Sequence, residues 1–100
     1  MNHLELTASV AEAQALRYTP AGIPAANFVL EHESEIVEAG TARQVKLIVK
    51  AVAFGVLAEQ VGQLALGKVF RFTGFLMNAR AGKGVVFHIQ AFGQATQPVF

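Results

Sequence analysis

One stretch limits the choice of fold more than any other: from residue 43 to residue 51, inward and outward side chains alternate strictly. One set of alternate positions is uniformly apolar, namely Val45, Leu47, Val49 and Ala51. The other set holds Gln44, Lys46, Ile48 and Lys50. Because successive side chains of an extended chain point to opposite faces, a period of two indicates a β-strand with one buried face. The chain must therefore contain a sheet or barrel that buries the apolar side of this strand.

The chain before this strand predicts two further strands. Residues 4–10 and 27–31 both alternate with a period of two. Residues 19–24 contain two prolines and a glycine, which predicts a turn that no strand crosses. Residues 33–41 contain three glutamates and a glycine, and we expect a charged loop there.

After the strand over residues 43–51, the spacing of apolar residues changes from two to that of a helix. Over 54–67 the apolar residues fall near helical spacing, and Gly67 is typical of a helix end, so a helix is expected. Alternation then returns and predicts two strands. The remaining expected elements are strands over 70–76 and 85–92, a glycine-containing loop over 78–84, and a short tail over 94–100.

The predicted order is three strands, one helix and two strands. A five-stranded barrel with its helix between strands three and four is the oligonucleotide/oligosaccharide-binding (OB) fold. Inward-facing side chains fill a small barrel, which explains why one set of alternate residues is so uniformly apolar. The sequence therefore favours an all-β protein with one OB-fold domain over residues 1–100. The order of elements alone is also compatible with another small barrel, or with a five-stranded sheet and one helix.

Composition excludes several classes of protein. With 100 residues, the chain fits one domain, and 53% hydrophobic content suggests that part of the apolar excess lies in a subunit interface. The absence of cysteine excludes a disulfide framework and thiolate chemistry. The first ten residues have no basic start, and the longest apolar run, 51–58, is far too short to span a membrane, so a cytoplasmic protein is expected. A net charge of +1 means that any site for nucleic acid must be local.

Several stretches resemble a known family. RYTPAGIPAANFVLEHE (17–33) resembles the region that joins the first two strands of bacterial single-stranded DNA-binding proteins. VAFGVLAE (52–59) and LGKVFRFTGFLMNAR (66–80) resemble the end of the third strand, the helix and the fourth strand of the same superfamily. Within it, AGIPAANFVLEHE running into EAGTARQ, in a chain that stops near 100 residues, is similar to the primosomal replication protein N family. The resemblance covers about 4–92 and is most specific over 20–44.

This resemblance implies a function. It implies a homodimer of OB-fold barrels that binds single-stranded DNA and helps to load or stimulate the replication-restart helicase. Other primosome proteins are then expected as partners. We expect no enzymatic activity, no cofactor and no metal.

The cations of this sequence are consistent with such a site. Binding a single strand requires cations along a groove and flat faces on which bases stack. Alternate residues of a strand are about 6.6 Å apart, close to the phosphate spacing of an extended strand. The predicted DNA-binding residues are six of the eight cations and the only tyrosine: Arg17, Tyr18, Arg43, Lys46, Lys50, Arg80 and Lys83. The alternative is that these charges form an ordinary solvated face.

The aromatic residues argue for weaker stacking. The chain has no Trp, and Ile48 stands where single-stranded DNA-binding proteins place a stacking Trp. Three phenylalanines are expected to fill the barrel: Phe70, Phe72 and Phe87. Tyr18 and Phe75 are the aromatic residues expected to be exposed, either to stack on a base or to pack at a dimer interface. We therefore expect binding dominated by phosphate contacts.

Three other patterns do not support catalysis. GQLALGK (62–68) matches the start of a phosphate loop, but Val69 follows where Ser or Thr would hold magnesium, and the segment joins a helix to a strand instead of the reverse. The histidines are too scattered to hold a metal: His3, His32 and His88. Three alternating glutamates lack a neighbouring nucleophile or base, so they predict a solvated edge or a barrier to DNA: Glu31, Glu33 and Glu35.

Two functions of different classes remain. One is a non-enzymatic accessory factor of replication restart that binds single-stranded DNA without sequence preference. The other is a protein-interaction barrel in which DNA binding is weak or vestigial. The cations favour the first, and the scarcity of exposed aromatic residues favours the second.

Overall fold

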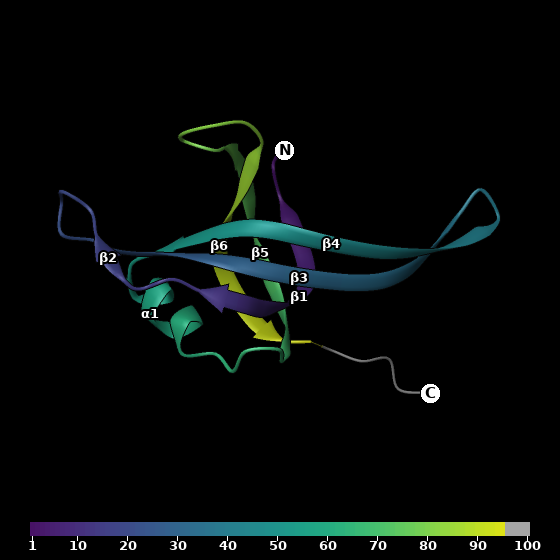
Figure 1. Cartoon of the computed structure of the whole chain (residues 1–100), viewed down its shortest axis with the longest axis horizontal. Coiled ribbons are helices and arrows are strands. Elements are labelled where there is room, and N and C mark those ends of the chain that lie inside the picture. Colours follow the sequence, from purple (N-terminus) through teal and green to yellow (C-terminus); the bar gives the residue numbers. More distant parts are fainter. Residues whose placement is uncertain (96–100) are drawn as a thin grey trace.

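The structure is a computed structural model that describes residues 1–95, and it is built of strands with one short helix (Figure 1). The elements are β1 (Leu4–Ala13), β2 (Arg17–Tyr18), β3 (Pro24–Glu38), β4 (Thr41–Phe54), α1 (Val56–Gly62), β5 (Val69–Asn78) and β6 (Val85–Gln94). The predicted all-β class is confirmed. Most of the expected C-terminal tail, 96–100, lies outside the described residues.

Five of the strands close into a barrel. The sheet order is β1-β5-β6-β4-β3-β2, and β1 also pairs with β3, which joins the two ends. The very short β2 pairs only with the start of β3, so the barrel consists of β1, β3, β4, β5 and β6. The helix α1 follows β4, which is the third barrel strand, and precedes β5, which is the fourth. This arrangement is consistent with the OB fold.

The core lies inside the barrel. All three phenylalanines expected to fill it are buried: Phe70, Phe72 and Phe87 are 8%, 0% and 0% exposed. Phe92 adds a fourth ring, whose centroid lies 6.2 Å from that of Phe70 in an edge-to-face arrangement. The helix α1 packs against β3 and β4 and buries Ala58 and Val61.

A bulge keeps the apolar side of β6 in the barrel. Gly74 pairs with Ile89 and Thr73 pairs with Ala91, so Gln90 is an extra residue. Without it, strict alternation would turn either Ile89 or Phe92 outward. Both side chains instead join the core cluster, while Gln90 is exposed.

The predicted helix over 54–67 is too long. The helix covers only Val56–Gly62, because Phe54 still belongs to β4 and Gly55, with a positive φ of 74°, precedes the first helical turn. Gly67 does not end the helix. Its N–H donates to the Val10 carbonyl at 3.1 Å, which ties the connection between α1 and β5 to β1.

The charged loop expected over 33–41 is wrong: this segment is strand. β3 and β4 pair without interruption as far as Glu38 and Thr41, leaving only Ala39 and Gly40 as the turn. Both turn residues have positive φ, 50° and 80°, as a two-residue turn of type I′ requires. Beyond Glu31, β3 has left β1 and pairs only with β4, so residues 32–47 form a two-stranded arm that projects from the barrel (Figure 1).

Candidate nucleic-acid interface

One row of residues crosses four neighbouring strands on the outer face of the barrel. Directly paired residues of neighbouring strands point to the same face. Phe75 of β5 pairs with His88 of β6, His88 pairs with Val52 of β4, and Val52 pairs with Asn27 of β3. These side chains therefore share the side opposite to the barrel interior, although Val52 itself is covered by its neighbours and is 5% exposed. Phe54 lies two residues beyond Val52 on β4 and belongs to the same face.

Three rings on this face are stacked. The ring centroids of Phe75 and His88 are 4.8 Å apart with an interplanar angle of 19°, and those of Phe54 and His88 are 5.8 Å apart at 26°. Phe54 is 43% exposed. We call Phe54, His88 and Phe75 the ring stack. A pocket of about 380 Å³ borders it, lined by these rings together with Leu57, Ile89 and Gln90.

Close approach of β5 and β6 supports the ring stack. A Cβ atom added to Gly74 would collide with the backbone carbonyl oxygen of His88 and lie 2.9 Å from a ring carbon of Phe87. Only glycine fits at this crossing, which allows Phe75 and His88 to stack. Partial burial lowers the pKa of His88 below its ordinary value of 6.5, because desolvation disfavours the charged ring. His88 is therefore a neutral aromatic ring at physiological pH.

Two cations border the row. The guanidinium Nη2 of Arg17 donates to the side-chain oxygen of Asn27 at 2.9 Å, which holds Arg17 at the β3 end of the row. Lys50 lies two residues before Val52 on β4 and is exposed on the same face, opposite Val29. The Pro/Gly turn fixes the approach of Arg17, since Gly22 N–H donates to the Thr19 carbonyl at 2.8 Å.

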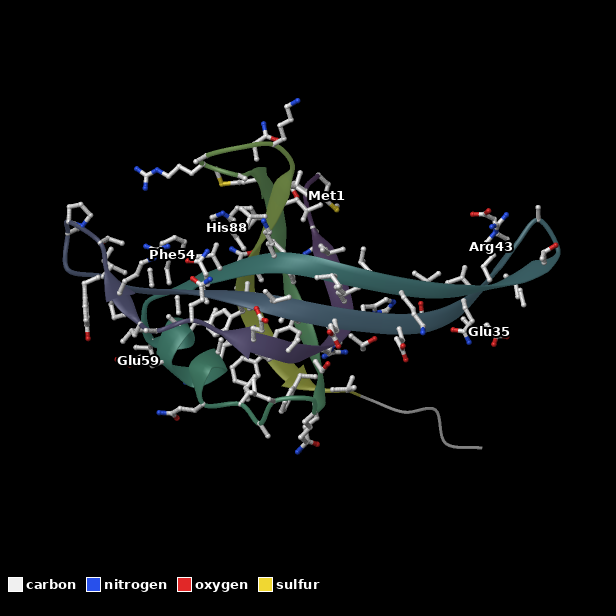
Figure 2. All side chains as sticks on the ribbon, in the orientation of Figure 1. Met1, Glu35, Arg43, Phe54, Glu59 and His88 are labelled. Carbon is white, nitrogen blue, oxygen red and sulfur yellow. The ribbon has the colours of Figure 1, made fainter. Side chains whose placement is uncertain are left out.

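The loop between β5 and β6 supplies two more cations. Arg80 and Lys83 are both exposed in this loop, which begins after the last pair of the hairpin, Asn78 and Val85. That pair lies three residues from the Phe75–His88 pair, or about 10 Å along the strands. In Figure 2 the labelled His88 and Phe54 lie on the upper side of β4, the side on which this loop projects.

The arm presents a different surface. Its outer face continues that of the ring stack but carries Glu33 and Glu35, with Glu31 at its base. Lys46 lies directly opposite Glu33 and pairs with it at 3.6 Å between Nζ and Oε1. The expected row of glutamates is thus present, and it makes this part of the face acidic.

Arg43 lies on the other face of the arm. Strand alternation separates it from Lys46 and Lys50, and its side chain pairs with Glu38 at 3.0 Å. Where the arm leaves the barrel there is a groove of about 700 Å³, bordered by Thr7, Ser9, Glu31, Glu33, Lys46 and Ile48 among others. His32 lies at this junction, and its ring nitrogens contact the Thr7 carbonyl at 2.5 Å and the Ser34 hydroxyl at 2.8 Å.

The structure thus separates the predicted DNA-binding residues into those near the row and those away from it. Arg17 and Lys50 border the row, and Arg80 and Lys83 lie in the loop beyond it. Lys46 is on the same face but within the acidic part, and Arg43 is on the opposite one. Tyr18 is 65% exposed on β2, and its neighbouring position in the strand turns it away from the face of Arg17.

Sequence reasoning missed two members of the ring stack, Phe54 and His88. It placed Phe54 at the start of a helix, and it considered His88 only in rejecting a metal site. The signal that was available is the pairing of an outward aromatic residue on the predicted fourth strand, Phe75, with an outward histidine on the fifth. The parallel contact of β4 with β6, which brings Phe54 to them, has no local sequence signal.

Two other kinds of site are absent from residues 1–95. In the described chain, no group of three or more His, Cys, Asp or Glu residues is arranged to hold a metal ion. No helix within residues 1–95 has the length and apolar character needed to cross a membrane.

The chain matches known proteins along most of its length. Residues 2–91 match the model of a family described as another single-strand binding protein family. The chain is 48% identical over 91 residues to the replication restart protein PriB of Bordetella pertussis, covering 90% of this chain and 85% of the relative. It is 30% identical over 90 residues to the PriB of Nitrosomonas europaea, covering 89% and 83%.

Solved structures agree with these relatives. The PriB structure from Ralstonia solanacearum superposes with a TM-score of 0.85 at 38% identity, covering 96% of this chain and 99% of that one. The SSB domain of a Synechococcus protein gives a TM-score of 0.72 at 22% identity, covering 94% and 96%, a likeness of fold alone. The identity to the curated relatives and the match over residues 2–91 assign the chain to a family. The chain belongs to the PriB replication restart proteins, within the wider family of single-strand binding proteins.

Proposed function

We propose that this protein is an accessory factor of replication restart that binds single-stranded DNA without sequence preference and without enzymatic activity. The observation that carries the proposal is the row of outward residues across the barrel, with stacked rings in its middle and cations at its borders. Flat rings and cations along one face are what an unpaired strand requires. The names of the relatives, replication restart protein PriB and single-strand binding protein, support the same function.

The path of the strand follows from the charges. Lys50 and Arg17 border the row, and Arg80 and Lys83 in the β5–β6 loop can fold toward it. Within the described chain these four cations are in no ion pair with a carboxylate, so they are free to neutralise phosphates. We infer that the strand crosses the barrel beneath this loop and avoids the arm, because Glu31, Glu33 and Glu35 repel phosphate. The predicted roles of Arg43, Lys46 and Tyr18 remain predictions.

We also propose that the protein is a homodimer. Residues Leu4–Ala8 of β1 pair with β5 on one edge, and no strand of the described chain pairs with their other edge. An unpaired edge is a template for a second chain. Exposed apolar side chains lie near this edge and along the arm: Ile36, Val37, Leu47, Ile48 and Val69. Sedimentation should give about 21 kDa, twice the chain mass of 10.7 kDa. A stable monomer at micromolar concentration would contradict the dimer.

The role in restart is the most distant part of the proposal. It consists of assisting a restart helicase together with other primosome proteins in the cytoplasm. Its support is the name shared by the relatives, and a suitable test is helicase unwinding of a forked DNA with and without this protein. If the protein binds single strands but leaves unwinding unchanged, the DNA-binding function stands and the helicase role does not.

Fluorescence anisotropy of labelled oligo-dT at two salt concentrations tests the binding function directly. Each phosphate contact on a single strand contributes roughly 0.7 to the slope of log affinity against log salt concentration. We expect binding that weakens steeply with salt. Lys68→Ala is the control, because Lys68 lies between α1 and β5, with its Nζ 5.4 Å from the Phe70 ring centroid. Absence of binding at low salt would favour the alternative function, a protein-interaction barrel.

A further inference from the structure

One side chain fastens the start of the chain to β5. The Nδ2 of Asn2 donates to the Leu76 carbonyl at 2.7 Å, and the Leu76 N–H donates to the Oδ1 of Asn2 at 3.0 Å. An amide side chain carries the same kinds of donor and acceptor as a peptide group, so it can replace a backbone partner. The ladder between β1 and β5 ends at the pair of Leu4 and Gly74, and Asn2 adds one contact two residues beyond it. We call these two hydrogen bonds the Asn2 clamp.

The Asn2 clamp lies at the base of the hairpin that carries the cationic loop. Leu76 pairs with Phe87 of β6, and the last pair of the hairpin, Asn78 with Val85, lies two residues farther along β5. On its other side β6 pairs with β4 only at Phe87 and His88. Figure 1 shows the start of the chain beside this end of the hairpin, where the β5–β6 loop projects from the barrel. The clamp is therefore placed to hold the part of β5 that leads into the loop.

This end of the hairpin is a two-stranded ribbon with few anchors. Among residues 1–95, no strand pairs with β5 beyond Gly74 on the side of β1. A two-stranded hairpin by itself is marginally stable in water. The hydrogen bonds from Asn2 to Leu76 are thus the anchor on that edge. Because Arg80 and Lys83 are carried by this ribbon, their position over the row depends on how firmly its base is held.

We propose that Asn2 is a positioning residue for the DNA-binding loop, because the Asn2 clamp holds residues 76–78 of β5 so that Arg80 and Lys83 project toward the row. This inference rests on the proposed single-strand binding and adds to it a residue outside the row. Since Asn2 acts through the two loop cations, its effect on DNA affinity must disappear when they are absent. A residue that served only the stability of the barrel would affect binding with or without them.

Hydrogen exchange tests the Asn2 clamp without DNA. Asn2→Leu keeps the approximate size of the side chain and removes both of its hydrogen-bonding groups. The Leu76 N–H should then exchange about 5-fold faster than in wild type, the change that corresponds to one net hydrogen bond of roughly 1 kcal/mol. Asn2→Ala should have the same effect. His3→Ala, at the exposed neighbouring position, is the matched control and should leave the exchange of Leu76 unchanged.

A double-mutant cycle tests the positioning role. Anisotropy of labelled oligo-dT compares wild type, Asn2→Leu, the variant with both Arg80→Ala and Lys83→Ala, and the triple variant. In the wild-type background, Asn2→Leu should weaken binding at low salt by about 2- to 5-fold, which corresponds to a coupling of about 0.5–1 kcal/mol, and should reduce the salt slope. In the background without the loop cations, it should change neither the affinity nor the slope.

The outcomes separate this inference from the function on which it rests. Unchanged exchange of the Leu76 N–H in Asn2→Leu would overturn the clamp. Faster exchange with unchanged affinity for oligo-dT would overturn the positioning role, and so would an equal loss of affinity with and without the loop cations. In these cases the binding function stands. If wild-type protein fails to bind oligo-dT at low salt, the binding function is overturned and the positioning role with it.

Discussion

The hairpin of β3 and β4 has two ends that share one outer face and differ in what that face can bind. At the barrel end it carries the ring stack, Lys50 and the Arg17 that Asn27 holds. At the arm end it carries Glu33 and Glu35, and its one lysine, Lys46, is paired with Glu33. By register, the same alternation of outward residues runs through both ends. The difference teaches that outward position alone does not define a binding site, because the neighbouring strands decide what surrounds each outward residue.

The two ends also differ in how they are stabilised. Residues of β3 and β4 in the barrel have a buried side, as with Leu30 at 0% exposed, whereas at the arm tip Ile36 is 51% exposed. The arm ion pair between Arg43 and Glu38 joins side chains that are 63% and 67% exposed, and exposed pairs contribute little, about 0–1 kcal/mol. The barrel therefore supplies most of the stability, and we expect the arm to tolerate change.

The largest expected contrast is in stability. Phe72→Ala removes a ring that is 0% exposed and should lower the free energy of unfolding by about 3–5 kcal/mol. Glu35→Ala, at an exposed and charged position of the arm, should change it by less than about 0.5 kcal/mol. Urea denaturation of both variants measures the contrast. An equal loss in the two would mean that the arm is packed in solution, for instance against a second subunit.

The next contrast concerns the cationic loop. Replacing Arg80 and Lys83 together with Ala should reduce the salt slope of oligo-dT binding by as much as about 1.4, two contacts of 0.7 each. The melting temperature should hardly change, since exposed loop charges contribute less than about 0.5 kcal/mol. Anisotropy and a thermal scan of the same preparation give both values. Affinity equal to wild type at low salt would remove the loop from the DNA path and favour the protein-interaction function.

A smaller effect should separate the two lysines of β4. Lys50→Ala should reduce the salt slope by about 0.7, because no carboxylate among residues 1–95 pairs with Lys50 at the barrel end. The double variant Glu33→Gln with Lys46→Gln removes a neutral ion pair from the arm and should leave the slope unchanged. Measuring the oligo-dT affinity of each variant at several salt concentrations shows which end of the hairpin contacts the DNA. A reduced slope in the arm variant alone would place the strand along the arm and confirm the predicted role of Lys46.

The smallest expected effect is the titration of His88. Burial lowers the pKa of the folded state below 6.5, so the unfolded state binds more protons as the pH falls past that value. The contribution of His88 to stability is therefore complete above pH 6.5, declines as the pH falls through the pKa of the folded state, and is constant below it. NMR titration of the ring should give a pKa below 6.5, and His88→Gln should lack this component of the pH dependence. A pKa above 6.5 would mean that the ring is not desolvated in the stack.

Much of the fold could be predicted from local pattern. The alternation over residues 43–51 predicted the central strand, and the buried phenylalanines at positions 70, 72 and 87 were predicted from the same period of two. The order of elements predicted the barrel and the place of the helix. These predictions succeeded because barrel strands bury one face, and burial imposes a period on the sequence.

The failures occurred where that constraint is absent. In the arm, residues 43–47 alternate as a strand does although their apolar side is not buried in the barrel, as Leu47 at 43% exposed shows. Residues 33–38 contain three glutamates, which suggested a loop in place of the strand that pairs with β4. The turn of the arm, Ala39-Gly40, lacks the Asn or Asp that usually identifies a type I′ turn. The helix was predicted too long because apolar spacing continues into residues 63–66, while hydrogen bonding of Gly67 to β1 takes the chain elsewhere.

By itself the sequence determined the period of the strands and the identity of their apolar residues, favoured a small five-stranded barrel, and supplied the cations that are candidates for contacting DNA. Only the tertiary structure decided which of these act together. It placed Arg43 and Lys46 with carboxylates on the arm, and it brought Phe54, His88 and Phe75 into one stack from three strands. The physical reason is that alternation is a property of one strand, whereas the neighbours of a side chain on other strands depend on the strand register and on how the barrel closes. Closure joins residues as distant in sequence as Val52 and His88, and no local pattern records that contact.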